Sequence, residues 1–258
     1  MNALSVFTLA ALALTPLINA QAVELNDSFE LIINPALVSD YRTSGISQTL
    51  GDPAAQLGIT LNHASGLYAG VWTSNVDFGN GSKTRQEIEY FAGYFWQIHD
   101  RISLDTFYTQ YEYPRQSDYN QGELKTVLDV YGVLLGGKYV RNMKGPDYED
   151  EHGEFHKGKQ DEDLSSWFIG YHTVLPAEVG LEARYEYVDY KDDVFFSNNG
   201  NGRADYHNWE IKLSRELVGV NWSLSYIDTD LSKAECTSFT GFDNLCSATI
   251  VAGASKTF

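Results

Sequence analysis

The stretch Gly180–Tyr190, GLEARYEYVDY, alternates between apolar and charged side chains. Its apolar positions share one face of an extended chain and are Leu181, Ala183, Tyr185 and Tyr187. Its charged positions share the other face and are Glu182, Arg184 and Glu186. Successive side chains of a β-strand point to opposite sides, so this segment predicts a strand with one apolar face and one charged face. The fold depends on which of these two faces meets water.

The composition narrows the class of protein. The chain has 258 residues, enough for one large β domain or two ordinary domains, and its formal net charge is −17. Such an excess of acids argues against a nucleic-acid partner, because neutralising phosphates requires an excess of Lys and Arg. Aromatic residues make up 14% of the chain, and 17 of them are Tyr. This suits strands with one apolar face better than a large dry core.

The N-terminus has the pattern of a signal peptide over residues 1–22. The apolar run Ala3–Leu14 is too short to span a bilayer as a helix, and Pro16 follows it. The A-x-A pattern that ends at Ala22 predicts cleavage after Ala22, with cleavage after Ala20 as the second choice. The first residues carry no Lys or Arg, so an uncleaved structural segment stays open as the alternative. No later apolar run has the length of a membrane helix.

The chain has two cysteines, Cys236 and Cys246, close together near the C-terminus. Two cysteines in an exported chain predict one disulfide bond. A bond that closes so short a loop stabilises the fold by at most about 3 kcal/mol. Two free thiols are the alternative.

The alternating pattern recurs along the whole mature chain and predicts about twelve strands. This is an even number, as bacterial single-chain barrels have. The least regular of them is 138–141, because Gly136-Gly137 just before it is read as a turn. The predicted strands are 29–38, 56–62, 67–76, 86–97, 102–112, 124–130, 138–141, 167–172, 180–190, 208–214, 220–226 and 247–258.

The connections between these strands alternate in length. The short ones are His63–Gly66, His99–Arg101, Gly136-Gly137, Pro176–Glu178 and Glu216–Gly219. The long ones are Arg42–Pro53, Val76–Thr84, Pro114–Gly122, Asn142–Asp163, Lys191–Arg203 and Asp230–Leu245. A soluble sandwich has no reason to place every long loop at one end, whereas a transmembrane barrel has short periplasmic turns and long outer loops. Residues 23–258 therefore predict an all-β, antiparallel, up-and-down transmembrane barrel, with a soluble lipocalin-like barrel or sandwich as the alternative.

The last residues agree with a membrane barrel. Ile250, Ala252 and Ala254 are in step with the terminal Phe258, which would lie in the interfacial aromatic girdle, although Lys256 interrupts that face. A closed barrel pairs all of its backbone groups without a free edge, as hydrocarbon requires. The apolar face of the opening stretch is therefore predicted to meet lipid, and its charged face a wet lumen.

An ordered set of segments resembles the TorF-like porin family of Gram-negative bacteria, which is also catalogued as a family of unknown function. The resemblance extends from about Val38 to Phe258 and implies an outer-membrane barrel and a diffusion channel. In that family the first outer loop often reads Tyr-Arg-aromatic-Arg-Gly. Here Arg42 is present but Thr43 and Ser44 precede Gly45, so a role for a second loop arginine does not carry over. The segments are VSDYRTSGISQT, GDPAAQ, GLYAGVWTSNVDF, EYFAGY, YEYP, DYHNWEIKLS, SYIDTDL and SKTF.

Charged residues on the predicted inward face are the candidate pore lining. Mixed charge inside a barrel sets up a transverse field that tunes which solutes pass. Alternatively, these charges pair across the lumen and plug it. Barrels of about eight strands are filled and those of sixteen to eighteen are open, so twelve falls between. The candidates are Glu87, Glu89, Asp105, Lys125, Asp129, Glu182, Arg184, Glu186, Glu210 and Lys212.

The sequence offers no recognisable site for other chemistry. The acidic loop 145–163 matches neither the H-E-x-x-H motif nor an EF-hand, so we expect a solvated loop, no metal site and no cofactor. No G-x-S-x-G nucleophile motif occurs, so we do not expect an enzyme.

These observations together predict a bacterial outer-membrane porin for passive diffusion of small hydrophilic solutes. The acidic charge favours cations or neutral solutes over anions. Outer-membrane lipid and lipopolysaccharide are the expected surroundings, and we allow for a homo-oligomer. A closed barrel whose loops bind a surface partner is the main alternative, and an outer-membrane hydrolase is the next.

Overall fold

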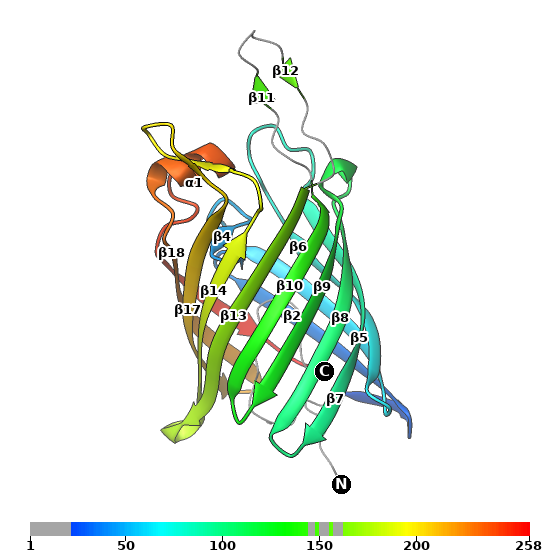
Figure 1. Cartoon of the computed structure of the whole chain (residues 1–258). Coiled ribbons are helices and arrows are strands. Elements are labelled where there is room, and N and C mark those ends of the chain that lie inside the picture. Colours follow the sequence, from blue (N-terminus) through cyan, green and yellow to red (C-terminus); the bar gives the residue numbers. More distant parts are fainter. Residues whose placement is uncertain (1–21, 144–147, 150–154, 157–161) are drawn as a thin grey trace.

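Twelve long antiparallel strands close into one barrel in the computed structural model, which describes residues 22–143, 148–149, 155–156 and 162–258 (Figure 1). Each strand pairs with the next along the chain, and the last strand pairs with the first to complete the ring. The predicted up-and-down barrel is confirmed. The strands are β2 (Phe29–Val38), β5 (Ala54–His63), β6 (Leu67–Asn75), β7 (Gln86–His99), β8 (Ile102–Glu112), β9 (Gln121–Val130), β10 (Val133–Met143), β13 (Glu162–Leu175), β14 (Val179–Asp189), β17 (Asp205–Leu217), β18 (Val220–Thr229) and β19 (Thr249–Ser255).

The two ends of the barrel differ, as Figure 1 shows: tight turns lie at one end and the long loops at the other. A short strand, β1 (Val23–Asn26), pairs with β2 at the turn end. Residues 1–21 of the expected signal peptide (1–22) and most of the acidic loop 145–163 fall outside the described residues. No helix among the described residues is long and apolar enough to cross a membrane. The smaller elements are β3 (Arg42–Thr43), β4 (Ile46–Ser47), β11 (Tyr148–Glu149), β12 (Phe155–His156), β15 (Phe195–Phe196), β16 (Gly202–Arg203), α1 (Lys233–Thr240) and two 3₁₀ turns, Ser117–Tyr119 and Pro176–Glu178.

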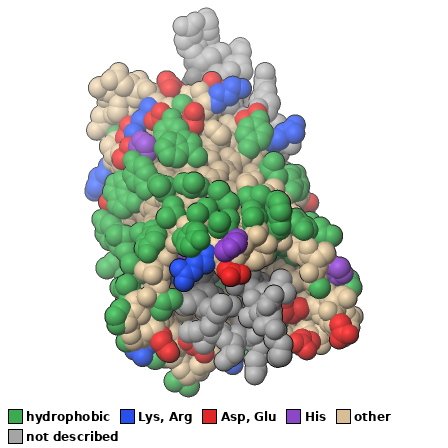
Figure 2. Space-filling model, turned by 60° about the horizontal axis from the view of Figure 1, so that its bottom comes forward, with side chains coloured by type: hydrophobic (Ala, Val, Ile, Leu, Met, Phe, Trp, Pro, Cys, Tyr) green, Lys and Arg blue, Asp and Glu red, His purple; other side chains and the backbone are tan. Residues whose placement is uncertain are grey.

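The apolar face of the strands is outside and the charged face is inside. On β14, Tyr185 is 42% exposed, whereas the next residue, Glu186, is completely buried. On β18, Leu224 is 56% exposed and Ser225 only 6%. Figure 2 shows hydrophobic side chains in a broad belt over the outer surface. This is the reverse of a soluble protein with an apolar core, so the opening stretch turns its charges inward.

One predicted turn is wrong. Gly136-Gly137 lies inside β10, and the chain turns earlier, at Tyr131-Gly132. Both turn residues have positive φ, 56° and 88°, as a two-residue hairpin turn requires. Gly136 does not form a turn; it makes room for a neighbouring side chain. A Cβ at this position would lie 2.3 Å from the ring of Phe168 on β13. The predicted strand 138–141 is therefore only the outer part of a longer one.

The long loop before β19 is held together locally. Ser232 caps α1 by accepting a hydrogen bond from the backbone of Glu235, whose side chain accepts one in return from the backbone of Ser232. A disulfide bond joins Cys236 on α1 to Cys246. The ring of Phe239 lies 4.9 Å from that of Phe195 on β15, so the last two long loops pack against each other.

Candidate functional site

The first long loop folds into the barrel instead of extending away from it. It carries the hairpin Arg42–Ser47, which includes β3 and β4 and which we call the inner hairpin. Lys138 Nζ on β10 donates a hydrogen bond of 2.9 Å to Ser44 Oγ, and the Tyr206 hydroxyl on β17 donates one of 2.9 Å to the Ser44 carbonyl. Because β10 is the sixth strand from β2 in either direction around the ring, the inner hairpin spans the interior.

Arg42 braces this hairpin. Its Nε lies 2.6 Å from the Asp40 carboxylate, and its Nη1 donates to the carbonyls of Gly45 and Ser247 at 2.9 and 3.1 Å. The side chain is only 5% exposed. The predicted first-loop residue, Arg42, therefore bonds to its own loop and to the loop before β19.

An acidic cluster faces the inner hairpin from the loop end of β7 and β9. It consists of Glu87, Glu89 and Glu123, all of them buried. Glu87 accepts hydrogen bonds from the hydroxyls of Tyr41 and Tyr113, at 2.7 and 2.6 Å. Burial raises the pKa of Tyr41 and Tyr113 well above the usual value, so both phenols keep their protons and act as donors. One of these tyrosines belongs to the first loop, so the cluster also anchors that loop.

A second cluster lies further round the wall and combines cations with a single buried acid. Glu186 accepts from Arg184 at 2.7 Å and lies 3.8 Å from Lys138 Nζ. Ser166 and Asn208 donate to the same carboxylate at 2.7 and 3.1 Å. Each carboxylate oxygen of Glu186 therefore has two polar neighbours, Ser166 and Lys138 at Oε1 and Arg184 and Asn208 at Oε2.

Aromatic rings lie beside these cations. The Arg184 guanidinium is 4.3 Å from the centre of the Phe168 ring. Lys125 Nζ lies 5.8 Å from the ring centre of Phe107 and 6.0 Å from that of Phe168. Such contacts hold cations over the negative faces of the rings, so Lys125 is directed toward aromatic faces.

The remaining candidate residues lie nearer the turn end. Asp105 accepts from the Tyr68 hydroxyl at 2.7 Å, and Asp129 pairs with His172 Nε2 at 2.8 Å. Glu182 faces Lys212 across the β14–β17 ladder, and Glu210 faces Arg184. The structure thus places all ten predicted charges on the inner face but divides them among several groups. Their role as a pore lining stays a prediction.

Sequence reasoning missed four interior partners: Tyr68, Glu123, Lys138 and His172. Glu123 was missed because the predicted strand began one residue later, at 124, and Lys138 because its strand was the least regular. Both share an inward face with Lys125. Extending the alternation by one residue would have found Glu123. No local signal links Tyr68 to Asp105, because their contact comes from the closed sheet.

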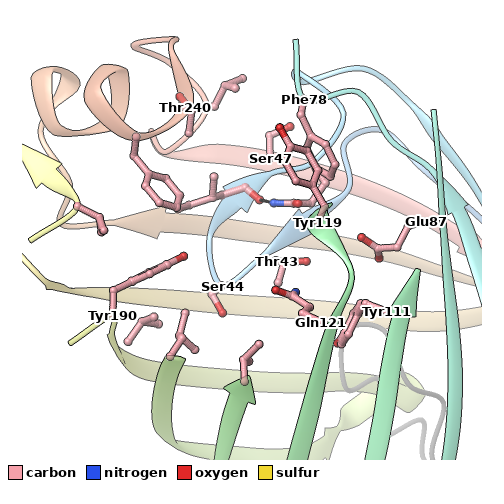
Figure 3. Close-up of a pocket in the computed structure, with 18 of the residues that line it drawn as sticks. Thr43, Ser44, Ser47, Phe78, Glu87, Tyr111, Tyr119, Gln121, Tyr190 and Thr240 are labelled. Atoms are coloured by element: carbon pink, nitrogen blue, oxygen red, sulfur yellow. Dashed lines mark hydrogen bonds between the residues drawn. The ribbon is translucent and has the colours of Figure 1, made fainter. Parts of the chain in front are cut away.

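A cavity of about 660 Å³ lies around the inner hairpin at the loop end. Figure 3 shows Glu87, Tyr111, Tyr119 and Gln121 on one side of it and Tyr190 on the other. Its polar side contains Glu87 and Glu123 of the acidic cluster and an aromatic group in which the rings of Phe78, Tyr113 and Tyr119 lie 5.6 to 6.1 Å apart. Its other side is mostly apolar, so the cavity is amphipathic.

Nothing in the described residues indicates a bound metal. No group of three or more His, Cys, Asp or Glu side chains there could hold a metal ion. The chemistry that this interior offers is hydrogen bonding, charge and aromatic contact.

The chain is similar in fold to a solved porin, and two further porin structures align with it less well. The NanC porin, in a rhombohedral crystal form, aligns over 87% of this chain and 97% of its own, with 9% identity and a TM-score of 0.53. The KdgM porin aligns over 88% and 99%, with 11% identity and a TM-score of 0.48. A KdgM porin in complex with disordered oligogalacturonate aligns over 88% and 98%, with 9% identity and a TM-score of 0.49.

Sequence comparison gives the family. No curated protein matches the chain. A family model described as "Bacterial protein of unknown function (Gcw_chp)" matches residues 22–258, nearly the whole chain. This chain belongs to the Gcw_chp family of bacterial proteins of unknown function.

Proposed function

We propose that this protein is an outer-membrane channel through which small hydrophilic solutes diffuse passively. One observation carries the proposal: a closed ring of strands has a mostly apolar outer surface, and all ten candidate charges lie on its inner face. Such a surface suits hydrocarbon, and such an interior suits water and polar solutes. The fold shared with the NanC porin and the resemblance to the TorF-like porin family support it.

The proposal includes export and placement. Residues 1–22 act as a cleaved signal peptide, and residues 23–258 form the mature barrel. Outward-facing aromatic side chains, among them Trp96, Trp167 and Trp222, are each more than half exposed, as in a belt that contacts lipid. The turn end faces the periplasm and the long loops face the exterior, where outer-membrane lipopolysaccharide surrounds them.

The inner hairpin makes this channel narrow. It contacts the wall at β10 and β17, and Tyr41 just before it bonds to Glu87 on β7, so a solute has to pass beside this loop. Carboxylates of the acidic cluster lie at that level, and they favour cations and neutral solutes over anions. We therefore expect small conductance and selectivity rather than a wide, general pore.

Reconstitution in a planar bilayer tests the channel. Purified protein should give discrete, voltage-independent conductance steps in KCl, whereas the same preparation after heat denaturation should give none. Far-UV circular dichroism of the sample before insertion checks that the barrel is folded. A folded protein that inserts but never conducts would show that the channel proposal is wrong.

A closed barrel with a loop-mediated surface role is the second candidate, and one observation favours it. Large apolar side chains are buried inside the ring beneath the inner hairpin, including Phe91, Phe107, Leu134 and Phe168. If these fill the lumen, the outer loops carry the function. Absence of conductance together with binding of cells or matrix proteins by the intact barrel is the result that this candidate requires.

A further inference from the structure

We call the cavity around the inner hairpin the outer cavity, and one corner of it holds three adjacent polar side chains that have no partner among the described residues. Tyr111 on β8 faces Gln121 across the ladder to β9, and Glu123 is the next inward residue on β9. All three line the cavity. Within the part of the chain that the structure describes, none of these side chains has a hydrogen-bond or ion-pair partner. They form one continuous polar patch on two adjacent strands.

Glu123 points to the charge of the missing partner. The residue is only 7% exposed, and a buried carboxylate is costly unless a cation or a set of donors compensates it. Its neighbours Glu87 and Glu89 add negative charge, and the hydroxyls bound to Glu87 are neutral. Lys125, two residues further along the same face, attracts Glu123 electrostatically, but it lies over aromatic rings and makes no ion pair with Glu123 among the described contacts. A cation is therefore the complement of this patch.

The kind of cation follows from the acceptors. A primary ammonium group has three N–H donors and no acceptor. The patch offers three acceptors: the Tyr111 hydroxyl, the Gln121 amide oxygen and the Glu123 carboxylate. The far side of the cavity is apolar and includes Ile46, Val140 and Leu164, all of them buried hydrophobic residues of one cluster. A ligand with an ammonium group and an apolar body would satisfy both sides at once.

We propose that the outer cavity is a binding site for primary organic amines, with the ammonium group on Tyr111, Gln121 and Glu123. The inference rests on the proposed channel in one respect, because it names the class of solute that this channel admits. Binding itself can be measured without conduction, so the two proposals can fail separately.

Calorimetric titration of the detergent-solubilised protein at low ionic strength tests the site. The probe is phenethylammonium, with two analogues of the same apolar body. 2-Phenylethanol lacks the charge, and phenethyltrimethylammonium keeps the charge but has no N–H donor. We expect saturable binding of phenethylammonium and at least about tenfold weaker binding of both analogues, as expected when hydrogen bonds to a charged group are lost.

Two variants locate the site. Glu123→Gln keeps the size of the side chain and removes its charge, and should weaken phenethylammonium binding by about tenfold or more. Glu210→Gln removes an interior charge that does not line the cavity, and should bind as the unmodified protein does. Circular dichroism verifies that both variants are folded.

The outcomes separate the two proposals. Equal binding of the alcohol, or unchanged binding by Glu123→Gln, overturns the amine site. Conductance without any binding overturns the amine site and leaves the channel standing. Binding without conductance leaves the amine site standing and overturns the channel.

Discussion

At the scale of single residues, Glu186 shows how a charge is tolerated inside the ring. Its carboxylate has two cations and two neutral donors around it, and the side chain has no exposed surface. Removing one member of a buried ion pair leaves the others uncompensated, which costs more than the pair contributes. The interior charges near β14 therefore behave as a linked unit.

We predict that Glu186→Gln lowers the free energy of unfolding by about 3–5 kcal/mol, because Arg184 and Lys138 lose their shared counter-charge. Urea titration of protein folded into liposomes measures the change. Glu216→Gln is the matched control, since Glu216 is exposed near the end of β17 in the same barrel. Equal stability of the two variants would contradict the assignment of Glu186 as the centre of the group.

Gly136 gives a second prediction at this scale. Phe168 lies where a Cβ would be, and its ring is fixed between Arg184 and the cluster of Val127 and Leu134. Overpacking of this kind costs about 1–3 kcal/mol, so Gly136→Ala should destabilise the barrel by that amount. Gly58→Ala is the control.

Gly58 is an inward strand glycine whose nearest contact with an added Cβ would be an ordinary 3.5 Å, to Trp72. Its substitution should change stability by no more than about 1 kcal/mol, because alanine loses less conformational freedom than glycine. The same urea titration compares the two variants. A Gly136→Ala protein as stable as the Gly58→Ala protein would show that the Phe168 ring can move aside.

At the scale of elements, the alternation of apolar and polar residues predicted most strands well but predicted the ends of β10 poorly. A diglycine is a strong turn signal, and it concealed the true turn at Tyr131-Gly132 five residues earlier. In a barrel, a glycine inside a strand also makes room for a large ring on the neighbouring strand. The alternation is local and can be read from the sequence. The need for that space cannot, because it comes from Phe168, thirty-two residues away.

The inward path of the first loop could not be predicted from the sequence either. The sequence placed Arg42 in an outer loop, and nothing nearby shows that the loop enters the ring. The decisive contact joins Ser44 to Lys138, 94 residues apart in the chain. The positions of the ten interior charges, by contrast, follow from period-two alternation alone. What alternation cannot supply is which charges meet across the lumen.

The inner hairpin should control conductance. Tyr41→Phe and Ser44→Ala together remove the hydroxyls that bind Glu87 and Lys138. Each hydrogen bond contributes about 1 kcal/mol net, so displaced hairpins should become about 5–30 times more populated. Single-channel recordings should then show larger or more frequently fluctuating steps than the unmodified protein.

Ser82→Ala is the control for this double variant. Ser82 lies in the second long loop, and its buried hydroxyl has no hydrogen-bond partner in the described part of the chain. Its recordings should match those of the unmodified protein. Unchanged steps in the double variant would mean that solutes do not pass beside the hairpin.

At the scale of the whole molecule, the barrel separates two solvents with one wall. Hydrocarbon requires an apolar outer surface and a backbone whose polar groups are all paired. Because this requirement acts on every strand, the apolar alternation recurs along the whole sequence. The interior has no such uniform requirement. Its charges form separate groups, acidic near β7 and β9 and more basic toward β10 and β14, so a solute meets a field directed across the ring.

Ion selectivity follows from this charge distribution. The acidic cluster lies at the level of the inner hairpin, and the protein carries a formal charge of −17, so a KCl gradient across a bilayer should give a reversal potential of the sign that indicates cation preference. The screening length shortens from about 30 Å at 0.01 M salt to about 3 Å at 1 M. The preference should therefore be strong in dilute KCl and weaken steadily in concentrated KCl. Glu89→Gln should reduce the cation preference at low salt, whereas Glu216→Gln at the exposed end of β17 should leave it unchanged. Anion preference in dilute KCl would show that the basic group near β10 and β14, and not the acidic cluster, governs passage.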